Sequence, residues 1–95
     1  MKIQNKESGN QGVFFIDEGG KLLAEMTYSL TNEQLMTIEH TQVEDALRGQ
    51  HIGNDLVASA VEYARSKQIK IIPECSFARS ILESKKDFAD VLQQS

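Results

Sequence analysis

The sequence predicts an α/β fold: a mixed sheet, made of an antiparallel meander plus one parallel strand, with flanking helices. Two contrasting patterns carry this prediction. Up to residue 43, short apolar stretches alternate with polar residues between turn-forming segments, which is typical of antiparallel strands. From residue 52, apolar residues recur at helical spacing, and a short apolar run follows at 69–74. A strand, a helix and a second strand in this order normally form a parallel pair.

Composition limits the class of protein. The 95 residues are expected to form one domain over residues 1–95. The net charge is −4 with no long basic run, which argues against a nucleic-acid partner, because binding to a phosphate backbone needs a clustered positive surface. Residues 1–12 lack the apolar core of a signal peptide, and no apolar run reaches the roughly 20 residues of a membrane span. We therefore expect a cytoplasmic protein without a membrane partner.

The cysteine and histidine content also limits the class of protein. Cys75 is the only cysteine, so no intrachain disulfide can form, which suits a reducing compartment. The two histidines, His40 and His51, provide no recognisable ligand set with Cys75. We expect no metal site.

The first half of the chain is expected to form four strands joined by turns. Their expected ranges are 3–8, 12–17, 21–30 and 35–43. The third has the clearest alternation, with Leu22, Ala24, Met26, Tyr28 and Leu30 on one face. The turn residues at 17–20 and 31–34 make the set a meander.

The fourth strand carries an irregularity. Met36 and Ile38 share one face, whereas Val43 falls on the other face if the strand is regular. A β-bulge near His40 to Gln42 would shift the phase by one residue and reconcile them. The alternative is that Val43 simply begins the following loop.

The second half is expected to contain a helix, a strand and a second helix. Ile52, Leu56, Val57, Ala60, Val61 and Ala64 have helical spacing. The run 69–74 is a short strand that Pro73 ends. Ser76 is the expected N-cap of the second helix, whose apolar stripe would contain Phe77, Ile81 and Leu82.

The loop at residues 48–53 is the candidate ligand site. Small residues beside a helix start allow backbone N–H groups to converge on an anion such as a phosphate. The spacing alone equally fits a tight turn without a ligand. The loop lacks the G-K-[ST] of a P-loop, and no G-x-G-x-x-G followed by an acidic residue indicates a dinucleotide fold.

This loop resembles that of a known family. R-G-Q-H-I-G, followed by N-D-L-V, is similar to the acyl-CoA pyrophosphate loop of the GNAT superfamily of N-acetyltransferases, Q/R-x-x-G-x-G/A. Arg48 and Gly53 match its first and last positions, whereas His51 stands where the family usually has glycine. H-T-x-V at 40–43 and I-I-P-x-C-x-F-A at 71–78 resemble the short stand-alone N-acetyltransferase-like proteins.

The resemblance implies a fold with a V-shaped cleft and an acetyl-CoA-dependent transfer of an acetyl group to an amine. The bulged strand would expose backbone groups, up to Val43, to the pantetheine arm of the cofactor. The loop and helix start would hold the pyrophosphate through Arg48, Gly49, Gln50, His51, Ile52, Gly53 and Asn54. If φ of His51 is positive, roughly 1 kcal/mol of strain follows and cofactor affinity should suffer.

Three residues are candidates for acyl-transfer chemistry. His40 and Glu39 lie at the end of the fourth strand, and in a regular strand only one of them can reach the substrate. His40 has the better unperturbed pKa for a base, although a lone strand histidine is often structural. Cys75, between a strand and a helix start, could be a nucleophile with a lowered pKa or an inert pocket residue.

One departure from the family keeps the alternatives open. Many GNAT enzymes use a tyrosine on the second helix as the acid for the leaving thiol, and residues 76–84 contain none. Either Cys75 fills that role, or turnover is weak or absent. The alternatives to an enzyme are therefore a non-catalytic CoA- or acyl-CoA-binding regulatory module, or an interaction domain. The acceptor is an amine of a small molecule or protein, and we expect a monomer or weak dimer.

Overall fold

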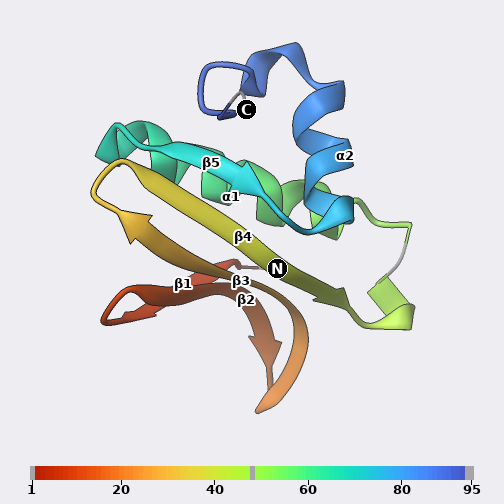
Figure 1. Cartoon of the computed structure of the whole chain (residues 1–95). Helices are drawn as coiled ribbons and strands as arrows, with labels where there is room; N and C mark the ends of the chain where they lie inside the picture. The colour runs from red at the N-terminus through yellow and green to blue at the C-terminus, as the bar shows by residue number, and fades with distance from the viewer. Residues whose placement is uncertain (1, 48, 94–95) are drawn as a thin grey trace.

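The computed structural model describes residues 2–47 and 49–93 and contains a five-stranded mixed sheet (Figure 1). The strands are β1 (Gln4–Ser8), β2 (Gln11–Glu18), β3 (Lys21–Asn32), β4 (Leu35–Val43) and β5 (Lys70–Pro73). They lie in the order β1-β2-β3-β4-β5; β1 to β4 pair antiparallel, whereas β4 and β5 pair parallel. The predicted meander with one parallel strand is confirmed.

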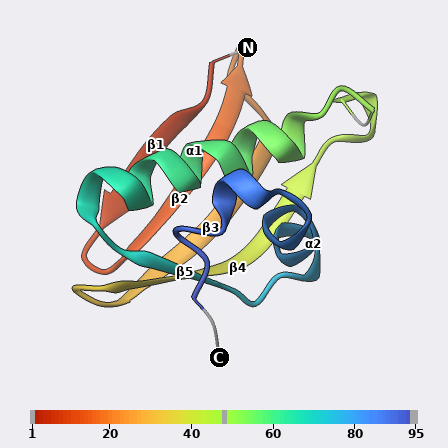
Figure 2. The ribbon, with the colours of Figure 1, turned by 90° about the horizontal axis from the view of Figure 1, so that it is seen from above.

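Two helices cover one face of this sheet (Figure 2). They are α1 (Ile52–Lys67) and α2 (Ser76–Ser84), and short 3₁₀ helices η1 (Asp45–Leu47) and η2 (Lys86–Phe88) follow β4 and α2. All six apolar α1 residues predicted from helical spacing are buried: Ile52, Leu56, Val57, Ala60, Val61 and Ala64. They pack with the buried sheet residues Phe14, Ile16, Ala24, Met26, Tyr28, Met36, Ile38 and Ile71. Neither helix is long and apolar enough in the described part of the chain to cross a membrane.

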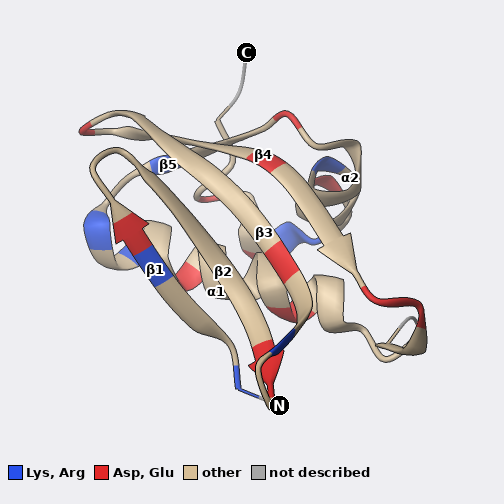
Figure 3. Cartoon of the chain, turned by 90° about the horizontal axis from the view of Figure 1, so that it is seen from below, with Lys and Arg blue, Asp and Glu red and all other residues tan. Residues whose placement is uncertain are grey.

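Among the described residues, no helix lies on the opposite face of the sheet. Figure 3 shows the strands facing the viewer from this side, with α1 behind them. Polar side chains such as Thr27, Ser29, Glu39 and His40 belong to this face, as their register with one another shows. We call it the open face.

The predicted bulge is present in β4 but lies one residue earlier than expected. Thr27 pairs with His40 and Tyr28 pairs with Ile38, so Glu39 is the extra residue. The bulge changes the phase of the strand after Ile38. Thr41 consequently lies opposite buried Met26, on the helix-covered face, as the phase argument required.

Two expectations for α2 were wrong. The N-cap is Cys75 rather than Ser76, which is the first helical residue, and Cys75 makes no side-chain capping bond. Phe77 is not a core residue: its side chain is 46% exposed, and Ala78 is buried instead. The face of α2 that packs on the core is therefore centred on Ala78 and Leu82.

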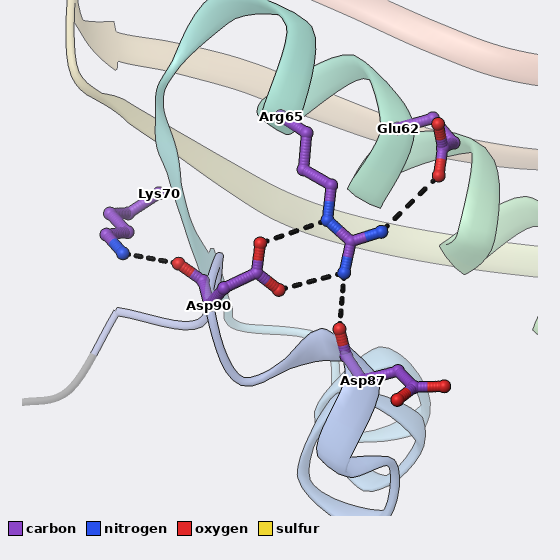
Figure 4. A network of polar contacts seen from close by, with 5 residues as sticks. All are labelled: Glu62, Arg65, Lys70, Asp87 and Asp90. Carbon is purple, nitrogen blue, oxygen red and sulfur yellow. Dashed lines mark hydrogen bonds and ion pairs between the residues drawn. The ribbon is translucent and has the colours of Figure 1, made fainter.

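The C-terminal segment returns to the free edge of β5 and to α1. Ile71 N–H donates to Val91 O at 2.6 Å, and Gln93 N–H donates to Ile71 O at 2.9 Å. Arg65 of α1 donates through Nε and Nη2 to the two carboxylate oxygens of Asp90, at 3.0 and 2.8 Å (Figure 4). The segment thus covers an edge that would otherwise expose unpaired backbone groups.

Candidate functional site

The site begins where β4 and β5 separate. Their pairing ends at Ile38 and Pro73, and Ile38 O accepts hydrogen bonds from the N–H groups of Glu74 (3.0 Å) and Cys75 (3.2 Å). Beyond this point β4 continues to Val43 paired with β3 alone, while the chain after β5 turns into α2. The edge of β4 after the bulge therefore faces an opening in the sheet.

A cavity of 540 Å³ extends from this opening towards the start of α1. The residues that line it come from β4, the following loop, the first turn of α1 and α2: Thr41, Val43, Leu47, Gly49, His51, Ile52, Gly53, Asn54, Phe77 and Ile81. One part of its wall is apolar, while the part at the start of α1 offers backbone groups and small polar side chains. This combination suits a ligand with an anionic end and a long, weakly polar arm.

The start of α1 is a candidate anion site because of its backbone conformation, and we refer to it as the anion site. Gly49 has φ 87° and open space around its Cα atom, and the N-cap His51 has φ 60° and ψ 25°. His51 makes no side-chain capping bond to the helix. The first-turn N–H groups, which lack intrahelical acceptors, remain available to an anion together with the positive end of the helix dipole.

Because φ of His51 is positive, the backbone strain expected for this conformation is present. A non-glycine residue in this region costs roughly 1 kcal/mol or more. The His51 ring is paired with the third residue of the helix, because its Nδ1 lies 3.3 Å from Asn54 Nδ2. Both side chains line the cavity.

Gln50 was expected to contact the cofactor, but the structure places it outside the cavity wall. Gln50 N–H donates to Leu47 O at 3.3 Å and its side chain to Ala46 O at 3.5 Å, and Gln50 does not line the cavity. Arg48 lies outside the described residues. The other expected residues, from Val43 to Asn54, line the cavity.

Cys75 is not among the residues that line the cavity, but it contacts one of them. Its Sγ is 3.5 Å from Thr41 Oγ1, which joins the start of α2 to the part of β4 beyond the bulge. Burial alone would raise the pKa of the Cys75 thiol, but hydrogen bonds from the Thr41 hydroxyl and from the backbone of Ala78, Phe77 and Thr41 outweigh it and lower the pKa. A thiol with a lowered pKa has more thiolate, the nucleophilic form.

Glu39 and His40 lie on the open face instead of in the cavity. Ser29 Oγ donates to Glu39 Oε2 at 3.3 Å, and the backbone oxygen of His40 accepts from Thr27 Oγ1 at 3.5 Å. The bulge places both side chains on this face, although neighbours in a regular strand would point to opposite faces. They sit beside the opening, one and two residues after the last β4 residue paired with β5.

The sequence alone missed several residues of the cavity wall. Leu47 and Ile81 belong to it, and so does Phe77, which was assigned to the core. Thr41 appeared only as part of a motif. Its position in the H-T-x-V segment, just before Val43, was the signal that could have indicated a side chain at the opening.

Comparison with known proteins assigns the family. The model for GCN5-related N-acetyl-transferase matches residues 13–91. Because this match spans most of the chain, the chain belongs to the GCN5-related N-acetyltransferase family, and the resemblance to GNAT enzymes is confirmed. By class it is an acyl-CoA N-acyltransferase with acetyl-CoA as cofactor. No curated protein matches the sequence.

Solved structures support the same fold. A GCN5-like protein from Staphylococcus aureus, described as a candidate N-acetyltransferase, is 36% identical with a TM-score of 0.74; the match covers 97% of this chain and 89% of that one. The ribosomal-protein-S18-alanine N-acetyltransferase of Escherichia coli is 14% identical (TM-score 0.67; 82% and 53% covered). A candidate streptothricin acetyltransferase from Bacillus anthracis, in complex with acetyl coenzyme A, is 18% identical (TM-score 0.63; 81% and 47% covered). The chain thus spans about half the length of the last two.

The cavity fits the cofactor of this family. Gly49 leaves open space where a phosphate can approach the backbone, and the first turn of α1 presents N–H groups beside it. The apolar wall formed by Val43, Ile52 and Ile81 is suited to a pantetheine arm. The cavity also reaches Thr41, whose hydroxyl contacts Cys75.

Proposed function

We propose that this chain transfers the acetyl group of acetyl-CoA to a primary amine at the opening between β4 and β5. The observation that carries the proposal is that one cavity joins the anion site at the start of α1 to Thr41, the contact of the Cys75 thiol. An acetyltransferase needs one binding site that holds the phosphates of the cofactor at one end and places the thioester beside the amine at the other.

In this proposal the chain's own residues divide the work of binding. The N–H groups at the start of α1 hold the pyrophosphate, with Gly49, His51 and Asn54 around it, and the Arg48 guanidinium adds a positive charge. Val43 and the apolar wall enclose the arm. Acetyl-CoA, when bound, supplies an acetyl group activated as a thioester.

Cys75 is the proposed reactive group on the cofactor side. As a thiolate it attacks the carbonyl carbon, and the bond to the CoA sulfur breaks, which gives S-acetyl-Cys75 and the CoA thiolate; the amine then takes the acetyl group and releases Cys75. The hydrogen bonds that lower the pKa of Cys75 support this role. In the simpler form of the proposal, Cys75 takes no part in the reaction and the amine attacks the thioester directly.

The acceptor amine is proposed to approach from the open face. Glu39 and His40 lie there, beside the opening, and either could accept the proton that the ammonium group must lose before it attacks. The β1 and β2 strands are joined by a two-residue turn at Gly9 and Asn10, so no helix between them walls this side. A large acceptor, such as a protein amine in the cytoplasm, is sterically compatible with that open approach.

Cofactor binding is the first test. A thermal-shift titration with acetyl-CoA, at a hundredfold excess over the dissociation constant, should stabilise the protein by about 2.7 kcal/mol. For a domain of this size that corresponds to roughly 10 to 20 °C in Tm. Adenosine, which lacks both the phosphates and the arm, is the control. No shift with acetyl-CoA at millimolar concentration would reject the proposal.

Mass spectrometry then separates the roles of Cys75. Incubation with acetyl-CoA and no acceptor should add one acetyl group to the protein, and Cys75→Ala should abolish it. Cys75→Ser, which keeps a hydroxyl near Thr41, is the matched control for packing. Acetyl transfer to an amine that survives Cys75→Ala would remove Cys75 from the reaction.

A second candidate function is an acyl-CoA-binding module without turnover. The observation that favours it is the lack of a tyrosine among the described residues of α2, 76–84, where many family members carry their acid. Binding of acetyl-CoA with no transfer to any amine in a broad panel, and no acetyl-Cys75, would support the module over the enzyme.

A further inference from the structure

The cavity wall contains one titratable side chain among its described residues, and that is His51. The other described wall residues are glycines, apolar side chains, Thr41 and Asn54. The cofactor class proposed above brings a pyrophosphate, and in CoA also a 3′-phosphate, into this setting. His51 is therefore the one residue of the described wall whose side chain can carry a charge.

His51 lines the cavity at the start of α1. As N-cap with φ 60°, His51 stands directly before the N–H groups of the first helical turn. Its Nδ1 is 3.3 Å from the Asn54 amide, which fixes the ring beside the cavity. Because an amide carries both an acceptor oxygen and a donor NH₂, Asn54 can pair with neutral or protonated imidazole by turning over.

We propose that the His51 imidazole is a phosphate ligand and that cofactor binding is coupled to its protonation. This inference rests on the proposed function. A protonated imidazole donates from both nitrogens and makes charge-assisted hydrogen bonds, which are about twice as strong as neutral ones. Imidazole exchanges its proton between pH 5 and 8, so the affinity for the cofactor pyrophosphate rises as pH falls through this range.

His51 stands at a position where the resembled loop usually has glycine, and its side chain has a role there in this proposal. From the sequence, His51 was expected to be one of the residues that hold the pyrophosphate, and a positive φ there was expected to lower cofactor affinity through backbone strain. In the structure the strain is present, but the ring lines the phosphate end of the cavity. The side chain contributes an interaction that a glycine cannot make.

Acidic residues lie near the cavity in the described part of the chain. Asp55 follows in the first turn of α1, and Glu44 and Asp45 line an adjacent cavity that shares Thr41 and Val43 with this one. The wall residues from α2, Phe77 and Ile81, and those from β4 are uncharged. Apart from His51, the described wall thus contains no side chain that can carry a positive charge.

The test measures the dissociation constant of 3′-dephospho-CoA by calorimetry from pH 5.5 to 8.5. This ligand keeps the pyrophosphate but lacks the phosphate monoester, whose own ionisation near pH 6 would complicate the profile. For the unmodified chain, binding should weaken by roughly three- to tenfold across the range, as one linked proton allows. The matched variant is His51→Asn, because asparagine tolerates the left-handed conformation and does not titrate here.

His51→Asn should bind with a flat pH profile, and His51→Gln is the second variant if the first does not fold. Repeating the titration at pH 7 in buffers of different ionisation enthalpy counts the protons taken up, which should be fractional for the unmodified chain and near zero for the variant. Parallel pH profiles in the two proteins would overturn the role of His51 and leave the cofactor site standing. Absence of binding by both proteins at every pH would overturn the cofactor site as well.

Discussion

Phe77 lies so close to Gly53 that a Cβ atom on Gly53 would overlap the Cζ and Cε2 atoms of the Phe77 ring. Gly53 is in the first turn of α1 and does not have a positive φ, so its backbone would accept another residue. The glycine is required for space, because the α2 ring covers it. The contact joins the anion site of α1 to the helix that begins after Cys75.

The first prediction is that the effect of Gly53→Ala changes sign with the residue at position 77. In the unmodified chain the added methyl group must displace the Phe77 ring, and such overpacking costs about 1–3 kcal/mol. In a Phe77→Ala background the clash is gone, and alanine's helix propensity should make the same substitution stabilising by up to about 1 kcal/mol. Urea unfolding gives the free energy of unfolding of four proteins: the unmodified chain, Gly53→Ala, Phe77→Ala and the double variant. These four values complete the double-mutant cycle.

The size of the coupling is the decisive quantity in that cycle. Residues in contact show coupling energies of about 0.5–3 kcal/mol. If Gly53→Ala were equally destabilising in both backgrounds, the obstacle would not be the Phe77 ring.

The second prediction concerns backbone strain at His51. Replacement by glycine should stabilise the fold by roughly 1 kcal/mol, because φ 60° carries no steric cost for glycine. Gln68→Gly is the matched control, since Gln68 caps the other end of α1 with φ 59°. Both variants should raise the urea midpoint; a lower midpoint for His51→Gly alone would show that contacts of the ring, such as that with Asn54, outweigh the strain.

Periodicity was sufficient to predict the sheet and α1, because each buries a single face. The same argument failed for α2. Residues 77, 81 and 82 and residues 78, 81 and 82 both form a helical stripe, and only the position of α1 and β5 decides that Ala78 is buried and Phe77 exposed. A nine-residue helix contains too few positions to distinguish two stripes one residue apart.

The candidate site was predictable in part. The loop and Cys75 were found because their residue types sit at fixed places relative to a helix start. The position of Glu39 and His40 on one face was not predictable, because it depends on which residue of β4 is the bulged one, and that is set by the register with β3. Phe77 entered the cavity wall through packing between α1 and α2, which no local pattern reveals.

The third prediction concerns acid sensitivity at the β1 edge. The Glu7 carboxylate accepts hydrogen bonds from the hydroxyls of Tyr63 and Tyr28, the latter at 2.7 Å, and these bonds lower the pKa of Glu7 below its ordinary value of 4.5. A carboxyl group with a lowered folded-state pKa stabilises the fold above its unfolded-state pKa and loses this contribution as pH falls through the folded value.

The free energy of unfolding should therefore fall below about pH 4.5 in the unmodified chain more steeply than in Glu7→Gln. Burial, with the Glu7 bond, raises the pKa of Tyr63 to about 12, so these tyrosines stay neutral throughout the experiment. Urea unfolding between pH 3 and 7 measures the difference. Glu33→Gln, in the turn after β3, is the control and should leave the slope unchanged. Identical slopes for the unmodified chain and Glu7→Gln would contradict the prediction.

The fourth prediction is that Arg65 holds the C-terminal segment on α1. Beyond its two bonds to Asp90, Arg65 donates to the Asp87 backbone oxygen, while Lys70 donates to the Asp90 backbone oxygen. The guanidinium lowers the pKa of the Asp90 carboxyl. Because Arg65 and Asp90 are accessible to solvent, the pair should weaken at high salt and when Asp90 is protonated at low pH.

Hydrogen exchange at Ile71 reports on this docking, since its N–H donates to Val91 O. Arg65→Lys cannot make the two-pronged contact with Asp90 and should speed this exchange, with a small effect on global unfolding. Glu62→Gln is the matched control, because it removes the carboxylate 3.4 Å from Arg65 Nη1 and leaves the Asp90 contacts in place. Equal exchange in the Arg65 variant and the unmodified chain would mean that the backbone bonds between Ile71 and residues 91 and 93 hold the segment without Arg65.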